Sequence, residues 1–188
     1  MGNNWAIVVG ISQYAHMECL PYAKQDAEAV EDYIEQSAGI EKVYTFLDDS
    51  SDLTLDEGVT IPAHPTVANL KRFLQIRFAT PFLQPTDTLW FFFHGHGLHH
   101  ANRDYLMPKD ADPLAIENSA IPVDVLVDYL KQSGTNQIVL VLDACHTKET
   151  QFGQGFGTDP RGVITLFSSD YNQTSQSIEN LKQGAFTY

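Results

Sequence analysis

Short apolar runs alternate along the chain with segments in which apolar residues recur every three or four positions. Five of these runs are continuous and rich in β-branched or aromatic residues, which predicts buried strands at residues 5–10, 43–47, 88–93, 137–142 and 162–167. Strands that are apolar on both faces are typical of parallel sheets covered by helices on both sides. The pattern therefore predicts an α/β sandwich with a central, mainly parallel sheet, its strands ordered 2-1-3-4 and continuing through the fifth.

Helical segments lie between the predicted strands. Residues 22–38 carry apolar positions at helical spacing and are followed by Gly39, while Thr66 can cap the N-terminus of a second helix. Residues 122–133 predict a third helix, with a proline early and Gly134 just past its end. The apolar face of the second helix would carry Val67, Leu70, Leu74 and Phe78. We expect an extended stretch at 104–107, loops at 48–65 and 147–162, and the start of another helix at 183–188.

The composition fits one globular domain with a sizeable core. The chain has 188 residues, of which 43% are apolar and 19% charged. Its 24 acidic and 11 basic residues give a formal net charge of −13. Because nucleic-acid binding depends on clustered Lys and Arg, this charge argues against a nucleic-acid partner and favours cationic ligands. No apolar run approaches the roughly 20 residues of a membrane span, and the start lacks a signal peptide, so we expect no membrane partner.

The two cysteines, Cys19 and Cys145, are too few for a disulfide framework. Disulfides are rare in reducing compartments, so this composition favours a cytoplasmic location. The final residues resemble the start of a further element. We therefore expect the chain to be a truncated part of a longer protein, in which regulatory domains or partner proteins flank this one.

Two of the predicted strands run directly into residues that can carry out chemistry. The third strand is followed by HGHG (residues 94–97), and the fourth by DACH (residues 143–146). Functional groups of open parallel sheets gather at the carboxyl ends of the strands, and neighbouring strands lie about 4.8 Å apart. A histidine there can favour deprotonation of a nearby cysteine thiol to the nucleophilic thiolate. The amides of Gly97 and Cys145 are then natural donors for a developing oxyanion.

An ordered set of motifs resembles the caspase-like cysteine peptidases, in particular the metacaspases and their bacterial relatives, the orthocaspases. The motifs are WAIVVGISQY, LPYAKQDAEAV, FFFHGHG, DYLMPKD, IVLVLDACH and GAFTY, and they cover almost the whole chain. The resemblance implies a caspase-like three-layer αβα sandwich with His96 as the base and Cys145 as the nucleophile. His96 precedes Cys145 by 49 positions, close to the spacing of about 50 in caspases. His94 occupies a place often held by a small residue in metacaspases and is not expected to be catalytic.

The resemblance also implies a specificity pocket with two acidic residues. Aspartate-cutting caspases carry Gln two residues before the nucleophile, where this chain has Asp143, and Asp26 matches an aspartate that metacaspases place early in the helix after the first strand. Two carboxylates in one partly desolvated pocket would hold a cation and reject an acid, because like-charge contact costs several kcal/mol there. We therefore expect protein or peptide substrates with Arg or Lys before the cut, Arg being favoured for its bidentate geometry.

Caspase-like chains are often cut between a large and a small part. By this resemblance residues 1–146 form a large-subunit-like part, residues 147–162 a linker loop, and residues 163–188 the start of a small-subunit-like part. Lys148 and Arg161 are the basic residues of that linker. A pocket that prefers cations would cleave the chain itself after one of them, which predicts a self-processing zymogen.

Calcium dependence is not expected. Calcium-dependent metacaspases hold the ion with several aspartates, and Asp110 matches one of them. However, Pro122 and Val123 stand where an acidic pair is expected, and Phe152 replaces a later acidic residue. A hard divalent cation needs roughly six or more oxygen ligands, so the site is incomplete. The sequence thus predicts activity without a cofactor and no metal site.

Two other functions fit parts of the sequence. The run HGHGLHH (residues 94–100) is similar to the HxHxDH motif of metallo-β-lactamase-like hydrolases, and clustered imidazoles suit zinc. In that family an aspartate stands where this chain has Leu98, and a zinc-dependent hydrolase would leave DACH without a role. The second alternative is a catalytically inactive caspase-like scaffold. The presence of both members of the His–Cys pair argues against it.

Overall fold

The computed structural model describes residues 2–37, 39–55, 58–145, 163–167, 177–178 and 183–184. The predicted linker at 147–162, which contains Lys148 and Arg161, lies outside these residues, as do residues 185–188. Within the described part of the chain, no helix is both long enough and apolar enough to cross a membrane.

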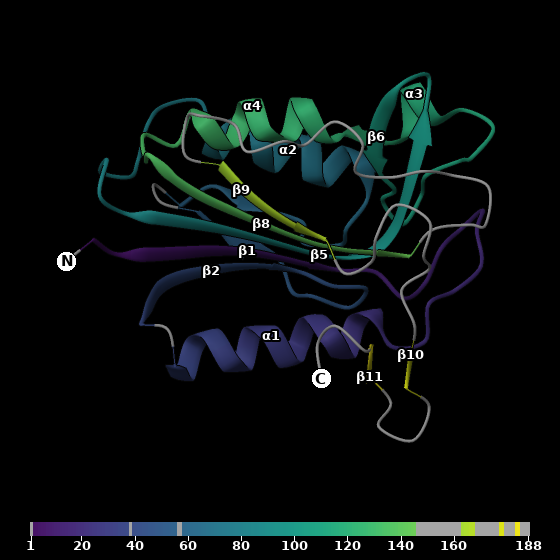
Figure 1. The fold of residues 1–188 in the computed structure, drawn as a ribbon, viewed down its shortest axis with the longest axis horizontal. Coiled ribbons are helices and arrows are strands. Elements are labelled where there is room, and N and C mark those ends of the chain that lie inside the picture. Colours follow the sequence, from purple (N-terminus) through teal and green to yellow (C-terminus); the bar gives the residue numbers. More distant parts are fainter. Residues whose placement is uncertain are drawn as a thin grey trace.

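A seven-stranded sheet forms the centre of the molecule (Figure 1). Five of its strands are parallel and stand in the order β2-β1-β5-β8-β9, which confirms the predicted order. Their bounds are β1 Asn4–Gly10, β2 Ile40–Phe46, β5 Thr88–His100, β8 Gln137–Cys145 and β9 Val163–Phe167. Two short strands, β6 (Arg103–Leu106) and β7 (Ile121–Pro122), extend the sheet in antiparallel pairing from the second half of β5.

Helices cover both faces of this sheet. Figure 1 shows α1 (Ala23–Ser37) on one side and α2 (Val67–Arg77) with α4 (Val123–Lys131) on the other. A short helix, α3 (Ile116–Ser119), lies near β6. Small hairpins pair β3 (Leu53–Thr54) with β4 (Thr60–Ile61) and β10 (Ser177–Ile178) with β11 (Gln183–Gly184). The arrangement confirms the predicted three-layer αβα sandwich.

The start of α2 follows from its capping residues. The Thr66 hydroxyl accepts the amide hydrogen of Asn69 (3.3 Å), as the sequence predicted. The Asp110 carboxylate, at 2.8 Å, accepts the amide hydrogen of Val67, which satisfies a second donor of the first helical turn. Asp110, the residue matched to a calcium site, is thus occupied in holding α2 in place.

Phe73 lies at the centre of the larger hydrophobic core, between α2 and the sheet. Its ring contacts the rings of Tyr44, Phe46 and Phe78, with centroid separations of 5.1, 5.0 and 6.3 Å. We expect Phe73→Ala to lower the free energy of unfolding by about 3–5 kcal/mol, because the cavity it leaves is surrounded by rigid rings. Urea denaturation measures this change.

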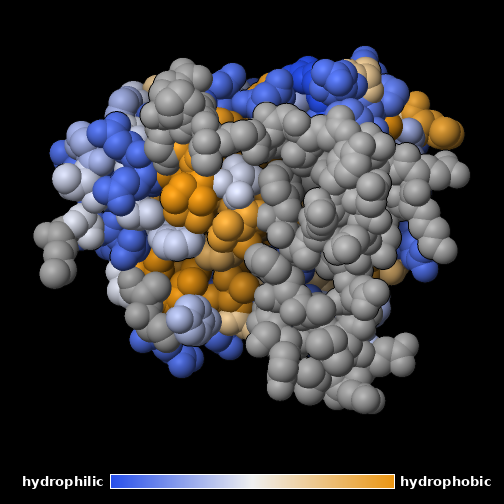
Figure 2. Space-filling view, in the orientation of Figure 1, coloured by the Kyte–Doolittle hydropathy of each residue, from blue (hydrophilic) through white to orange (hydrophobic). Residues whose placement is uncertain are grey.

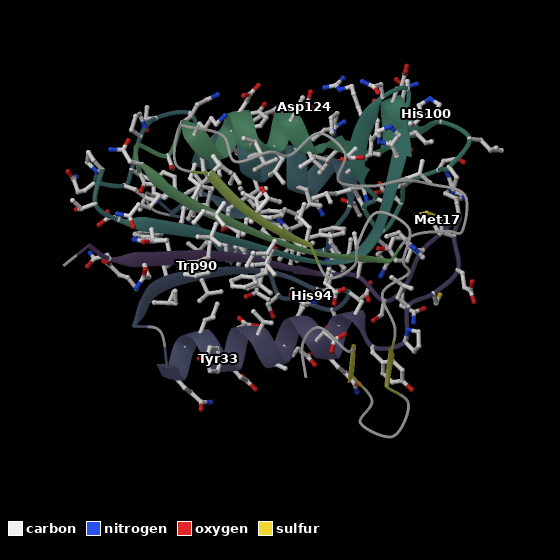
Figure 3. All side chains as sticks on the ribbon, viewed as in Figure 1. Met17, Tyr33, Trp90, His94, His100 and Asp124 are labelled. Atoms are coloured by element: carbon white, nitrogen blue, oxygen red, sulfur yellow. The ribbon has the colours of Figure 1, made fainter. Side chains whose placement is uncertain are left out.

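Tyr33 offers the control for this prediction. It lies on the outer side of α1, with 67% of the residue exposed, and Figure 3 shows it away from the sheet. We expect Tyr33→Ala to change the free energy of unfolding by no more than about 0.5 kcal/mol. Equal losses for the two variants would contradict the assignment of Phe73 to the centre of the core.

Five segments differ from the prediction. Residues 48–65, predicted as a loop, contain the hairpin β3–β4, and α3 was not foreseen. Gln183–Gly184 forms β11, where the sequence predicted the start of a helix. β5 continues to His100 and β8 to Cys145, beyond the apolar runs by which they were predicted. The reason is non-local: the polar half of β5 pairs with β6, and no apolar periodicity marks a strand that is held by such pairing.

β9 is the outermost parallel strand of the described sheet. Two of its large apolar side chains, Ile164 and Leu166, are exposed, and Figure 2 shows apolar surface on this side of the molecule. Among the described residues, β9 pairs with β8.

Candidate active site

The carboxyl ends of β5 and β8 bring the two chemistry-bearing motifs together. The two strands are parallel neighbours, and their register pairs His94 with Asp143 and His96 with Cys145. Paired positions on neighbouring strands lie about 4.8 Å apart. The expected adjacency of the HGHG and DAC segments is therefore confirmed at the level of the backbone, while the Cys145 side chain lies outside the described part.

His96 is half-buried and is held by the loop that follows β1. Its ring nitrogen Nε2 lies 2.8 Å from the Glu18 carbonyl oxygen. A carbonyl oxygen can only accept a hydrogen bond, so this contact requires the proton on Nε2. In that tautomer Nδ1 carries the lone pair, which can accept a proton from a thiol.

Tyr14, from the same loop, fixes the backbone at His96. The Tyr14 hydroxyl accepts the amide hydrogen of His96 at 2.8 Å, and the two rings lie 4.7 Å apart. Gly95 makes this approach possible, because a Cβ atom there would lie 2.6 Å from the Tyr14 hydroxyl oxygen and 2.8 Å from the Phe93 ring. A side chain at position 95 would thus displace Tyr14 from His96.

Asp48, which follows β2, anchors this loop. One of its carboxylate oxygens accepts the amide hydrogens of Ser12 (2.9 Å) and Gln13 (3.1 Å), and the other lies 3.0 Å from the Lys109 ammonium. Sequence reasoning missed Tyr14, Glu18 and Asp48 as supports of His96. Only Tyr14 carried a signal, as the last residue of WAIVVGISQY; the Glu18 contact uses a carbonyl group that every residue possesses.

The predicted oxyanion donors adjoin this pair. Gly97 follows His96 on β5 and pairs with Leu106 of β6, while Cys145 is the register partner of His96. Their two amides therefore belong to the same edge of the sheet as the imidazole. Their role in binding an oxyanion stays a prediction.

A row of three residues crosses the sheet two positions before this pair. The register aligns Gly10 of β1 with His94, and His94 with Asp143. Gly10 lets α1 approach the sheet closely, since a Cβ atom there would lie 2.4 Å from that of Ala27. Asp26, next to Ala27 in the first turn of α1, is thereby carried to the sheet.

Asp26, His94 and Asp143 converge in a buried group, which we call the acidic triad. One ligand atom from each lies within 4.8 Å of the others, and the three residues are only 3%, 1% and 6% exposed. Figure 3 shows His94 between the sheet and α1. The structure thus brings the two predicted pocket carboxylates together. It also inserts His94 among them, which the sequence did not predict.

The other imidazoles of the HGHGLHH run turn to separate partners. His99 Nδ1 lies 2.6 Å from the Asp104 carboxylate, and the His100 ring packs 6.5 Å from that of Tyr105. Among the described residues, the acidic triad is the group in which three potential metal ligands lie close enough together to share one ion. The geometry therefore does not support the zinc-hydrolase alternative, which needs the histidines of this run to converge.

Comparisons with known proteins agree with this architecture. No curated protein sequence matches the chain significantly. Among solved structures, the crystal structure of protein GSU0716 from Geobacter sulfurreducens resembles it with a TM-score of 0.66 at 14% identity, over 98% of this chain and 79% of that chain. At this identity the likeness shows the fold alone. The family model described as "Caspase domain" matches residues 3–188. Because that match spans nearly its whole length, the chain belongs to the caspase domain family of cysteine peptidases.

Proposed function

We propose that the protein is a cysteine endopeptidase that cuts after Arg or Lys by means of a His96–Cys145 dyad. The observation that carries the proposal is the register of β5 and β8. It pairs His96 with Cys145 and, two residues earlier, His94 with Asp143. Two residues correspond to about 6–7 Å along a strand. The long side chain of Arg or Lys can span that distance when its carbonyl carbon lies at Cys145.

The acylation step uses the tautomer set by Glu18. His96 Nδ1 accepts the proton of the Cys145 thiol, and the thiolate attacks the carbonyl carbon of the scissile bond. The amides of Gly97 and Cys145 donate hydrogen bonds to the oxyanion that forms. The imidazolium then gives its Nδ1 proton to the leaving amine, the C–N bond breaks, and a thioester remains on Cys145.

Deacylation reverses the proton path. His96 takes a proton from a water molecule, whose oxygen attacks the thioester carbonyl. The C–S bond breaks, Cys145 recovers its proton, and the product acid leaves. The Glu18 carbonyl, which accepts the Nε2 hydrogen throughout, orients the ring and stabilises the imidazolium of both steps.

The acidic triad supplies the basis of specificity in this proposal. Asp26 and Asp143 are both nearly fully buried, so their attraction for a cation is little screened by water. A guanidinium can bind two carboxylates with several hydrogen bonds, which favours Arg over Lys. An acidic side chain would be repelled by both groups.

We further propose that the chain is a cytoplasmic zymogen of the metacaspase or orthocaspase type that works without a cofactor. Two cysteines, too few for a disulfide framework, support the compartment. Lys148 and Arg161 are the basic residues in the segment where a large and a small part would separate.

A cleavage-site profile tests the proposal. The purified chain is incubated alone and with a peptide library, and the products are identified by mass spectrometry. We expect cuts after Arg and Lys in the library and after Lys148 or Arg161 in the chain itself, all absent with Cys145→Ala. Cleavage after Asp or Glu would contradict the pocket. The absence of turnover on every peptide, with binding of basic peptides retained, would favour a catalytically inactive scaffold.

A further inference from the structure

The acidic triad contains an imidazole whose position the proposed peptidase chemistry does not explain. His94 is 1% exposed, and neither of its ring nitrogens has a hydrogen-bond partner among the described residues. Burying an imidazole without such a partner costs free energy, because both nitrogens lose their hydrogen bonds to water. A polar ring in this state, facing two carboxylates, indicates that something else satisfies it.

The distance between His94 and Asp143 matches the separation of two metal ligands. His94 Nδ1 lies 3.4 Å from an Asp143 carboxylate oxygen, and the pair does not meet hydrogen-bond geometry. Two ligands at about 2.0–2.1 Å from a tetrahedral ion stand about 3.3–3.4 Å apart. A carboxylate oxygen of Asp26 also lies within 4.8 Å of a ligand atom of His94 and of Asp143, so a small movement would complete a three-ligand set.

We propose that Asp26, His94 and Asp143 bind a divalent transition-metal ion of the Zn²⁺ type. One nitrogen and two carboxylate oxygens suit zinc, whereas calcium and magnesium require more ligands and prefer oxygen alone. Two negative charges balance the charge of the ion in a site where an unpaired charge would be costly. Three protein ligands leave one coordination position open to water.

The position of this ion has a consequence that rests on the proposed function. The ion would occupy the place between Asp26 and Asp143 that the proposal gives to the substrate's cationic side chain. Both cannot bind there at once. Zinc is therefore an inhibitor that competes with Arg or Lys for the specificity pocket. It is not a cofactor that the reaction needs.

The binding test is made on the Cys145→Ala chain, which removes a thiolate that could itself bind zinc beside His96. Zn²⁺ is titrated by calorimetry, and Co²⁺ serves as a spectroscopic probe of tetrahedral coordination. We expect one ion per chain. His94→Ser should weaken its binding at least about 100-fold, and Asp26→Asn should also weaken it.

His99 provides the matched control, because it lies on the same strand and also faces a carboxylate. We expect His99→Ser to leave the zinc affinity within about twofold. Unchanged affinity in His94→Ser, or an equal loss in His99→Ser, would overturn the proposal. If His94→Ser does not keep the far-ultraviolet circular dichroism of the parent, His94→Gln and Asp26→Asn decide the question.

A competition experiment separates this proposal from the proposed function. Binding of a fluorescent arginine peptide to the Cys145→Ala chain is measured with and without Zn²⁺. With free zinc at ten times its dissociation constant, the apparent Kd of the peptide should rise about tenfold. If zinc binds through His94 but the arginine peptide does not bind, the metal site is supported and the proposed specificity pocket is refuted. Peptide bound with no zinc bound would refute the metal site alone.

Discussion

Replacing Cys145 with Ala is expected to lower kcat for arginine peptides by about 10³-fold or more, because it removes the nucleophile that forms the acyl-enzyme. His96→Ala should lower kcat by about 10²–10⁴-fold, the usual contribution of a general acid and base. Both effects should appear in kcat with little change in KM, since neither residue binds the cationic side chain. Steady-state kinetics on one fluorogenic arginine peptide measures all of these values.

The chain contains matched controls for both substitutions. Cys19 is an exposed free cysteine, so Cys19→Ala should keep full activity. His99 pairs with Asp104 and has no part in the proposed chemistry, so His99→Ala should retain most of the activity. A thiol-reactive arginine peptide should label the parent chain and not Cys145→Ala. Activity that survives Cys145→Ala would refute the nucleophile.

A second large effect is expected at the acidic triad. Asp143→Asn and Asp26→Asn should each lower kcat/KM for an arginine peptide by about 30-fold to several thousand-fold, the range for losing one partner of a buried, hydrogen-bonded charge pair (about 2–5 kcal/mol). Both carboxylates are nearly fully buried, so solvent screening does little to reduce this effect. A matched peptide with norleucine in place of arginine should lose less than about fivefold.

Asp104 is the control for this effect, because it is also a buried carboxylate that faces a histidine. Asp104→Asn should lower the kcat/KM values for the arginine and norleucine peptides by the same factor, whatever its effect on stability. Equal losses on the two peptides in Asp26→Asn or Asp143→Asn would remove the case for a cation-binding pocket. Circular dichroism of each variant establishes that the fold is retained.

Much of the sheet could be predicted from local pattern. Continuous apolar runs such as residues 137–142 are recognisable because a parallel strand is buried on both faces, and this property is written in consecutive residues. The helix after Thr66 was equally clear, since capping and apolar spacing act within one or two turns. The extensions of β5 and β8 were missed because polar residues there are held by neighbouring strands.

The residues that hold His96 in place could not be predicted from the sequence either, because they too act through contacts between distant segments. Tyr14 and His96 are 82 positions apart, and Glu18 contacts His96 through its backbone. Neither contact produces a periodic pattern in the amino-acid sequence. His94 was set aside because a small residue is common at its place in metacaspases, and its proximity to the two carboxylates became visible only in three dimensions.

The amino-acid sequence by itself determined the five parallel strands, their order in the sheet and the main helices, because burial on two faces and helical spacing are properties of neighbouring residues. It also placed His96 and Cys145 after adjacent strands. Only the tertiary structure decided what surrounds them: the register that aligns His96 with Cys145, and the close approach of α1 over Gly10 that carries Asp26 to His94 and Asp143. Such contacts depend on the packing of distant segments, which no local pattern encodes.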